Sequence, residues 1–175
     1  RDSNVAAARA TFDSWPLILD DSPSLTLMEV RAKARAVKRR HGLDLLILDY
    51  LQLMAGDAEN RNAAIEEITR GLKALAKELY IPVIALSQLS RKCDDRPNHR
   101  PMLSDLRDSG AIEQDSDIVV FVYREAVYRP DDSQWQNVGE LLIRKNRQGP
   151  LGDVRLFWNG PLTRFDNFAG EWPER

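Results

Sequence analysis

The chain has 175 residues, a length at which one globular domain can bury a sizeable core. Its net charge of -2 and its 43% hydrophobic content are ordinary for a globular protein and do not indicate a general nucleic-acid binder, although a local basic strip is compatible with them. The longest apolar run, residues 43–54, is interrupted by charged and amide side chains, so we expect no membrane association. The single cysteine, Cys93, excludes an internal disulfide, argues against zinc and favours a reducing, cytoplasmic location.

The first residues are typical of the inside of a helix. The chain begins with Arg1 rather than with methionine, and alanine is frequent over residues 1–9. We therefore expect a fragment that forms one partial domain, with a helical lead-in over residues 1–15 and a core over residues 16–168. The apolar residues 16–20 predict a short buried strand.

A well-capped helix is predicted next. Thr26 and Glu29 have the spacing of a capping box, which predicts a helix to about His41, and Gly42 is a suitable C-cap. The helix carries four basic residues at helical spacing, for which a solvated face is favoured over a DNA contact: Arg31, Arg35, Lys38 and Arg39.

A strand, a helix and a second strand follow with short connections. Residues 43–49 are nearly all apolar, which predicts a strand buried on both faces of a sheet. Apolar residues at spacings of three and four between Ile65 and Leu79 predict an amphipathic helix. Residues 82–87 predict another buried strand. This βαβ order predicts a parallel sheet and an α/β fold.

The C-terminal part predicts antiparallel strands. A loop over residues 104–110 leads into a short helical segment, and residues 117–123 predict a third buried strand. Further strands are predicted over residues 139–144, 154–158 and 162–165, with a hairpin turn signal at Asn159-Gly160. The expected fold is therefore a mostly parallel sheet flanked by helices, with an antiparallel hairpin at its C-terminal end.

Two polar residues follow the predicted parallel strands. Asp49 ends the first strand, where a carboxylate can hold a magnesium ion that bridges nucleotide phosphates. Gln88 ends the next strand, where its amide can sense a γ-phosphate or a water molecule. Each also has an ordinary structural explanation, because strands often end in polar residues that cap backbone groups.

Two further groups of residues suit phosphate chemistry. Lys145 and Arg147 lie two residues apart on an extended chain, so both can point toward one charged group, and an arginine finger of this kind can act in trans. Arg107, Asp108 and Gly110 lie in a loop whose arginine and backbone N–H groups suit a nucleic-acid phosphate. A charged turn and an ordinary polar loop are the alternatives. The chain contains no G-x-x-x-x-G-K-[ST] phosphate loop.

Five motifs together resemble the DnaB family of hexameric replicative helicases. The matching phrases are LDDS at residues 19–22, LDYLQLM at 48–54, ALSQLSR at 85–91, SDLRDSGAIEQDSD at 104–117 and KNRQGPLG at 145–152. The likeness runs from about residue 17 to residue 168. It implies a RecA-like core of the P-loop NTPase class, which uses ATP and Mg²⁺ at subunit interfaces of a hexameric ring and moves 5′→3′ on single-stranded DNA.

The resemblance also assigns roles to individual residues. Asp49 would bind Mg²⁺, and Gln88 would couple nucleotide state to DNA contact. Lys145 and Arg147 would reach the ATP site of the next subunit. Three residues would face the central channel and contact single-stranded DNA without sequence preference: Arg107, Asp108 and Gly110. A helicase loader and a primase are the expected further partners.

The missing parts of the family pattern lead to two further expectations. The phosphate loop and the glutamate that activates water would lie upstream of Arg1, so the chain alone would be inactive. Absence of the strand that feeds the phosphate loop would leave a gap or an exposed edge in the sheet, which invites association with another copy.

Two alternative interpretations stay open on the sequence. One is a non-catalytic RecA-like paralogue that acts as a DNA-binding or ring-scaffold module, although a scaffold has no need for Asp49, Gln88, Lys145 and Arg147 together. The other is a RecA-like ATPase of recombination or timekeeping, against which the motifs at residues 48–54 and 104–117 argue.

Overall fold

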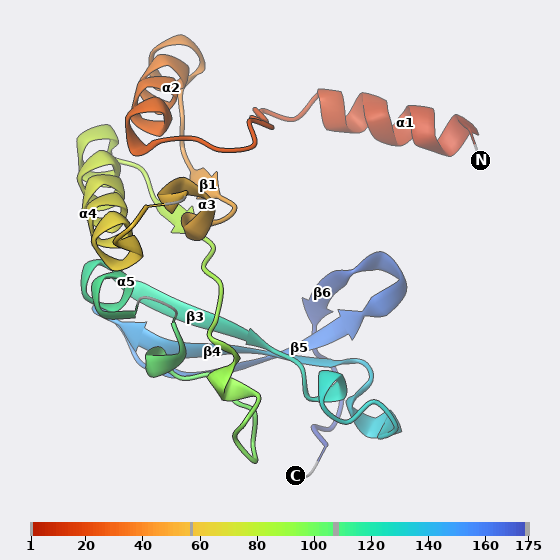
Figure 1. Cartoon of the computed structure of the whole chain (residues 1–175). Helices are drawn as coiled ribbons and strands as arrows, with labels where there is room; N and C mark the ends of the chain where they lie inside the picture. The colour runs from red at the N-terminus through yellow and green to blue at the C-terminus, as the bar shows by residue number, and fades with distance from the viewer. Residues whose placement is uncertain (1, 57, 107–108, 174–175) are drawn as a thin grey trace.

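The chain folds into helices and two β-sheets (Figure 1). The structure is a computed structural model that describes residues 2–56, 58–106 and 109–173. Its α-helices are α1 (Asp2–Asp13), α2 (Leu27–His41), α3 (Leu51–Ala55), α4 (Arg61–Leu79) and α5 (Ser109–Asp115). Its strands are β1 (Leu46–Leu48), β2 (Val83–Ala85), β3 (Ile118–Tyr123), β4 (Val138–Asn146), β5 (Gly152–Asn159) and β6 (Arg164–Asn167).

The capping box predicted for α2 is confirmed. The Glu29 backbone N–H donates to Thr26 Oγ1 at 3.3 Å, and the Thr26 backbone N–H donates to Glu29 Oε2 at 2.7 Å. These bonds satisfy two of the donors that a helix leaves open at its N-terminus. The helix ends at His41 and is followed by Gly42 in a positive-φ conformation, so the predicted length is also correct.

The predicted βαβ unit is confirmed. Strands β1 and β2 pair in parallel, with Leu46 opposite Val83 and Leu48 opposite Ala85. Helix α4 connects them and turns its apolar stripe into the main core, where four of the predicted residues are buried: Ile65, Ile68, Leu72 and Leu75. The spacing of three and four residues therefore marks the buried face of α4.

The predicted burial of these strands on both faces is wrong. Strand β1 is three residues long, and its central residue Ile47 is 57% exposed, as is Ile84 of β2 at 52%. Leu46 and Leu48 pack against the main core instead. Successive side chains of a strand point to opposite faces, and the described helices cover one face of this pair.

The predicted strand over residues 16–20 is also wrong. The segment joins α1 to α2 without strand structure, and Leu17, Ile18 and Leu19 are each at least half exposed. A strand requires a hydrogen-bonding neighbour, and the described residues place none beside this segment. Asp20 accepts from Ser22 and Lys33 instead, and α1 extends away from the other helices (Figure 1).

The C-terminal half forms a four-stranded antiparallel sheet in the order β3-β4-β5-β6. In β3 the residues alternate, with Val119, Phe121 and Tyr123 buried and their neighbours exposed, so the strand is buried on one face rather than on both. A 3-10 turn over Gly160–Leu162 joins β5 to β6, which confirms the predicted antiparallel end.

The predicted α/β class is confirmed, with the parallel part smaller than expected. Among the described residues, parallel pairing is confined to β1 and β2, and no strand hydrogen bonds join this pair to the β3–β6 sheet. No helix in the described ranges has the length and apolar character needed to cross a membrane. Asp49 and Gln88 therefore follow the strands of one sheet, whereas Lys145 and Arg147 lie on or directly after a strand of the other.

The core around α4 leads to a stability prediction. Leu75 is fully buried, so Leu75→Ala should lower the free energy of unfolding by about 2–5 kcal/mol through lost burial and the cavity left behind. Urea denaturation of the chain, followed by circular dichroism, measures this change. Met28→Ala, at a side chain that is 80% exposed on α2, should change it by less than about 0.5 kcal/mol. Equal effects of the two substitutions would contradict the packing described for α4.

Candidate functional site

Asp49 and Gln88 follow neighbouring parallel strands. The strand register continues beyond β1 and β2, because the Leu86 N–H donates to the Leu48 carbonyl at 2.9 Å and the Leu51 N–H donates to the Leu86 carbonyl at 3.0 Å. Both predicted residues are exposed at the carboxyl edge of this pair. The two residues therefore come to one edge, where ligands bind in open α/β sheets.

A buried amide joins the two strand ends. Gln52, in the first turn of α3, is 3% exposed. Its Oε1 accepts from the Gln88 backbone N–H at 3.1 Å, and its Nε2 donates to Ser87 Oγ at 3.0 Å. Sequence reasoning did not identify Gln52 or Ser87 as site residues. Their places inside the LDYLQLM and ALSQLSR phrases were the available signal.

The Asp49 carboxylate suits a magnesium ion that is shared with phosphates. It is exposed, and no contact among the described residues engages it. Within the described ranges, no group of three or more His, Cys, Asp or Glu residues could hold a metal ion by itself. Mg²⁺ commonly binds proteins through one or two carboxylates and takes its other ligands from water and nucleotide phosphates. Asp49 therefore fits as a single protein ligand in a site completed by a nucleotide.

The chain after Gln88 is tied to the segment before the predicted DNA loop. Leu89 forms an antiparallel bridge with Leu106, and the Ser90 N–H donates to the Asp105 carbonyl at 2.7 Å. Asp105 is 1% exposed, and Arg96 binds its carboxylate with both terminal nitrogens. This side-chain bond holds the pKa of Asp105 below its usual value of 3.8, against the opposing effect of burial.

The predicted DNA loop is described only in part. Arg107 and Asp108 lie outside the described residues, so their predicted roles stay predictions. Gly110 is exposed in the first turn of α5, and a Cβ at this position would meet no heavy atom within 4 Å. Among the described residues, the space beside the Gly110 Cα is therefore open.

Lys145 and Arg147 contact the C-terminal end of α5 rather than Asp49. Lys145 Nζ donates to the Glu113 carbonyl, and Arg147 Nη2 donates to the Gln114 carbonyl at 2.6 Å. Cations are favoured at this end of a helix, where carbonyls lack partners inside the helix. The guanidinium of Arg147 also lies 3.8 Å from Asp117 and is 53% exposed. The two cations are therefore held together, and Arg147 is accessible from outside the chain.

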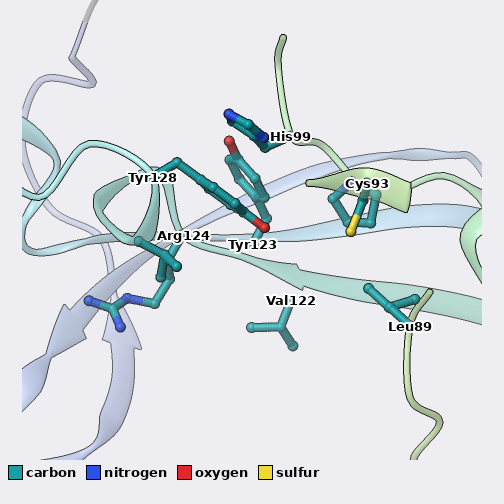
Figure 2. A pocket seen from close by; sticks show the side chains of 9 residues that line it. Leu89, Cys93, His99, Val122, Tyr123, Arg124 and Tyr128 are labelled. Carbon is teal, nitrogen blue, oxygen red and sulfur yellow. The ribbon is translucent and has the colours of Figure 1, made fainter. Parts of the chain in front are cut away.

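A cavity of about 160 Å³ lies elsewhere, at the end of β3 (Figure 2). It is lined by the stacked rings of His99 and Tyr128, whose centroids are 4.3 Å apart, and by Tyr123 and Cys93. Burial raises the pKa of the Cys93 thiol, which disfavours the reactive thiolate. None of the site residues predicted from the sequence lines this cavity.

Comparison with protein families decides where the chain belongs. Residues 2–167 match the family model described as the DnaB-like helicase C terminal domain. The chain belongs to this family. The match covers nearly the whole chain, in agreement with the resemblance found in the motifs.

Relatives that carry the name replicative DNA helicase DnaB support the family. The protein from Pasteurella multocida (strain Pm70) is 50% identical over 171 residues, which cover 95% of this chain and 36% of that protein. The protein from Haemophilus influenzae (strain ATCC 51907 / DSM 11121 / KW20 / Rd) is 53% identical over 156 residues, which cover 87% of this chain and 33% of that protein. The chain thus spans about a third of the length of these relatives.

Solved structures confirm the RecA-like α/β fold. One, described as an ATPase domain, has a TM-score of 0.88 and 37% sequence identity, and the match covers 95% of this chain and 60% of that chain. Another, described as a DnaB-like replicative helicase and its interactions with primase, has a TM-score of 0.86 and 38% identity, and covers 94% of this chain and 40% of that chain. The predicted fold is therefore confirmed over most of the chain.

The Asp105–Arg96 pair leads to a pH prediction. Because folding lowers the pKa of Asp105, its ion pair stabilises the chain above the usual value of 3.8 and this contribution is lost as the pH falls through the folded value. Asp105→Asn should therefore destabilise the chain by about 1–3 kcal/mol near pH 7, since it puts an amide N–H group against the donors of Arg96 and Met102.

Urea denaturation at a series of pH values tests this prediction. The difference in the free energy of unfolding between the unmodified chain and Asp105→Asn should become smaller below about pH 4. Asp44→Asn is the matched control, because Asp44 is exposed and its carboxylate makes no contact among the described residues. A difference that is constant from pH 7 to pH 3 would show that the ionised form of Asp105 contributes nothing.

Proposed function

We propose that the chain is part of a hexameric replicative DNA helicase that unwinds duplex DNA, moving 5′→3′ with ATP hydrolysis at subunit interfaces. The observation that carries the proposal is the convergence of Asp49 and Gln88 at one carboxyl edge of a parallel strand pair, in a chain of the DnaB-like helicase family. Both positions are exposed to a ligand. A replicative function accords with a cytoplasmic location.

Asp49 and Gln88 are assigned to the subunit's own nucleotide. Asp49 would bind the Mg²⁺ ion that accompanies ATP, and this ion would supply positive charge beside the phosphates. The exposed amide of Gln88 would contact the γ-phosphate or the attacking water. The Leu89–Leu106 bridge supports a connection from this residue to the DNA loop. The phosphate loop that cradles ATP would come from sequence outside this chain.

Lys145 and Arg147 are assigned to the nucleotide of the neighbouring subunit. Lys145 lies on β4 and Arg147 directly follows it, and both contact α5 rather than Asp49, which supports action in trans. The guanidinium of Arg147 is exposed and can be reached by another subunit. Such a finger neutralises the charge that develops on the transferred phosphoryl group.

Single-stranded DNA and other replication proteins are the proposed partners. Arg107, Asp108 and Gly110 would contact the phosphates of the strand, and the open backbone at Gly110 supports close approach. Contacts to the backbone carry no sequence information, so binding would not depend on sequence. A primase is a proposed partner because one solved relative is described with its primase interactions, and a helicase loader is proposed with it.

The absence of a phosphate loop from these 175 residues leads to the first functional prediction. The chain alone should not hydrolyse Mg²⁺-ATP, whereas a full-length protein that contains it should do so with single-stranded DNA present. In that protein Asp49→Asn should remove most of the activity, because the metal loses its carboxylate. The rate of phosphate release measures hydrolysis by the isolated chain, by the full-length protein and by its Asp49→Asn variant. Hydrolysis by the isolated chain that is abolished by Asp49→Asn would contradict the predicted inactivity.

The assignment of Arg147 leads to a subunit-mixing prediction. In the full-length protein Arg147→Ala should lower the rate of hydrolysis by roughly 10³-fold or more. If Arg147 acts in trans, rings that mix Arg147→Ala and Asp49→Asn subunits should recover part of the activity. An active interface forms where a subunit with an intact Asp49 meets a neighbour with an intact Arg147. Mixed rings that are as inactive as either variant would contradict action in trans. Arg164→Ala, at an exposed arginine paired with Asp166, is the control.

A further inference from the structure

Gln52 is a buried polar side chain whose contacts lie directly beside the proposed nucleotide site. Two residues separate it from Asp49 in the sequence, and its amide contacts the two residues that end the neighbouring strand segment, Ser87 and Gln88. At 3% exposure the amide is removed from water, so it is favourable only when both its oxygen and its nitrogen find partners.

The amide is not needed to hold the two strand ends together. Backbone hydrogen bonds from Leu86 to Leu48 and from Leu51 to Leu86 already join them on either side of Asp49. What Gln52 adds is an acceptor for the Gln88 backbone N–H and a donor to the Ser87 hydroxyl. These bonds orient the two residues at the end of this strand segment and do not set the register of the strands.

The direction of the bond to Ser87 has a chemical consequence. An amide nitrogen can only donate, so Ser87 Oγ accepts and keeps its own proton for another acceptor. Among the hydrogen bonds of the described residues, none uses that proton. A hydroxyl held in this way, one residue before Gln88 and at the same edge as Asp49, can donate to a phosphate oxygen.

We infer that Gln52 is a positioning residue for ATP hydrolysis. It orients the Ser87 hydroxyl as a donor to a γ-phosphate oxygen of the nucleotide. The inference rests on the proposed function and deepens it, because it makes Ser87 a phosphate contact and makes that contact dependent on Gln52. The proton of Ser87 stays on its oxygen throughout, so no bond is formed or broken there.

The test uses the full-length protein with Mg²⁺-ATP and a thymidine oligonucleotide. Gln52→Met has a similar length but loses both hydrogen bonds, and Ser87→Ala loses the proposed phosphate donor. We expect Ser87→Ala to lower kcat by roughly 100-fold, as loss of a direct phosphate donor does, and Gln52→Met to lower it by about tenfold. KM for ATP should change less than kcat, because the missing contacts act on the transferred phosphoryl group.

The double variant separates positioning from general damage. If Gln52 acts through Ser87, Gln52→Met should lower kcat little further once Ser87 is alanine, so the two effects are not additive. Leu51→Met, at the 2% exposed neighbour on α3, is the matched control for a changed core and should leave kcat unchanged within about twofold. Gln52→Glu is a second variant, since its carboxylate keeps the acceptor for Gln88 but cannot donate to Ser87.

The outcomes distinguish the inference from the proposed function. An unmodified protein that does not hydrolyse ATP with DNA present would overturn the proposed function. Once hydrolysis is established, three results would overturn the positioning role. The first is an unchanged kcat in both Gln52 variants, and the second is additive effects of the two substitutions in the double variant. The third is a loss of kcat in Leu51→Met equal to that in Gln52→Met. A lowered kcat in Gln52→Met or Gln52→Glu that disappears in the Ser87→Ala background supports it.

Discussion

The packing of the apolar face of α4 in the main core is the interaction on which the rest of the structure depends. Burial of each large aliphatic side chain along this face stabilises the fold by about 1.5–3 kcal/mol, and Ile65 and Leu75 are completely buried. Strands β1 and β2 have three residues each, and an isolated pair of strands is marginally stable at best. Packing of their core-facing residues beside α4 therefore holds the edge that carries Asp49 and Gln88.

This arrangement divides the proposed chemistry between two parts of the molecule. The parallel pair presents Asp49 and Gln88, whereas Lys145 on β4 and Arg147 just after it contact the end of α5. Helix α5 packs against α4, where the Thr69 hydroxyl lies 2.6 Å from the Asp115 carboxylate. The same core thus supports both groups while keeping them apart, as the proposed action of Lys145 and Arg147 on the nucleotide of a neighbouring subunit requires.

The periodic elements were predictable from the sequence, and the burial of the strands was not. The spacing of apolar residues locates α4, and Thr26 with Glu29 marks the start of α2, because both signals come from interactions within one helix. An apolar run such as residues 43–49 shows that a strand forms but not how many of its faces are covered. Residues 16–20 show the same limit, since a strand needs a neighbour that local sequence does not specify.

The sequence alone determined the family and the residue types of the candidate site, because the motifs at residues 48–54, 85–91 and 145–152 are contiguous. Only the tertiary structure decided which of these residues meet. The amide of Gln52 reaches Ser87 across 35 positions of the chain, and Lys145 reaches the end of α5 across 32. Such contacts depend on strand register and helix packing, which arise from the whole core, so a local stretch of sequence does not specify the partner of each residue.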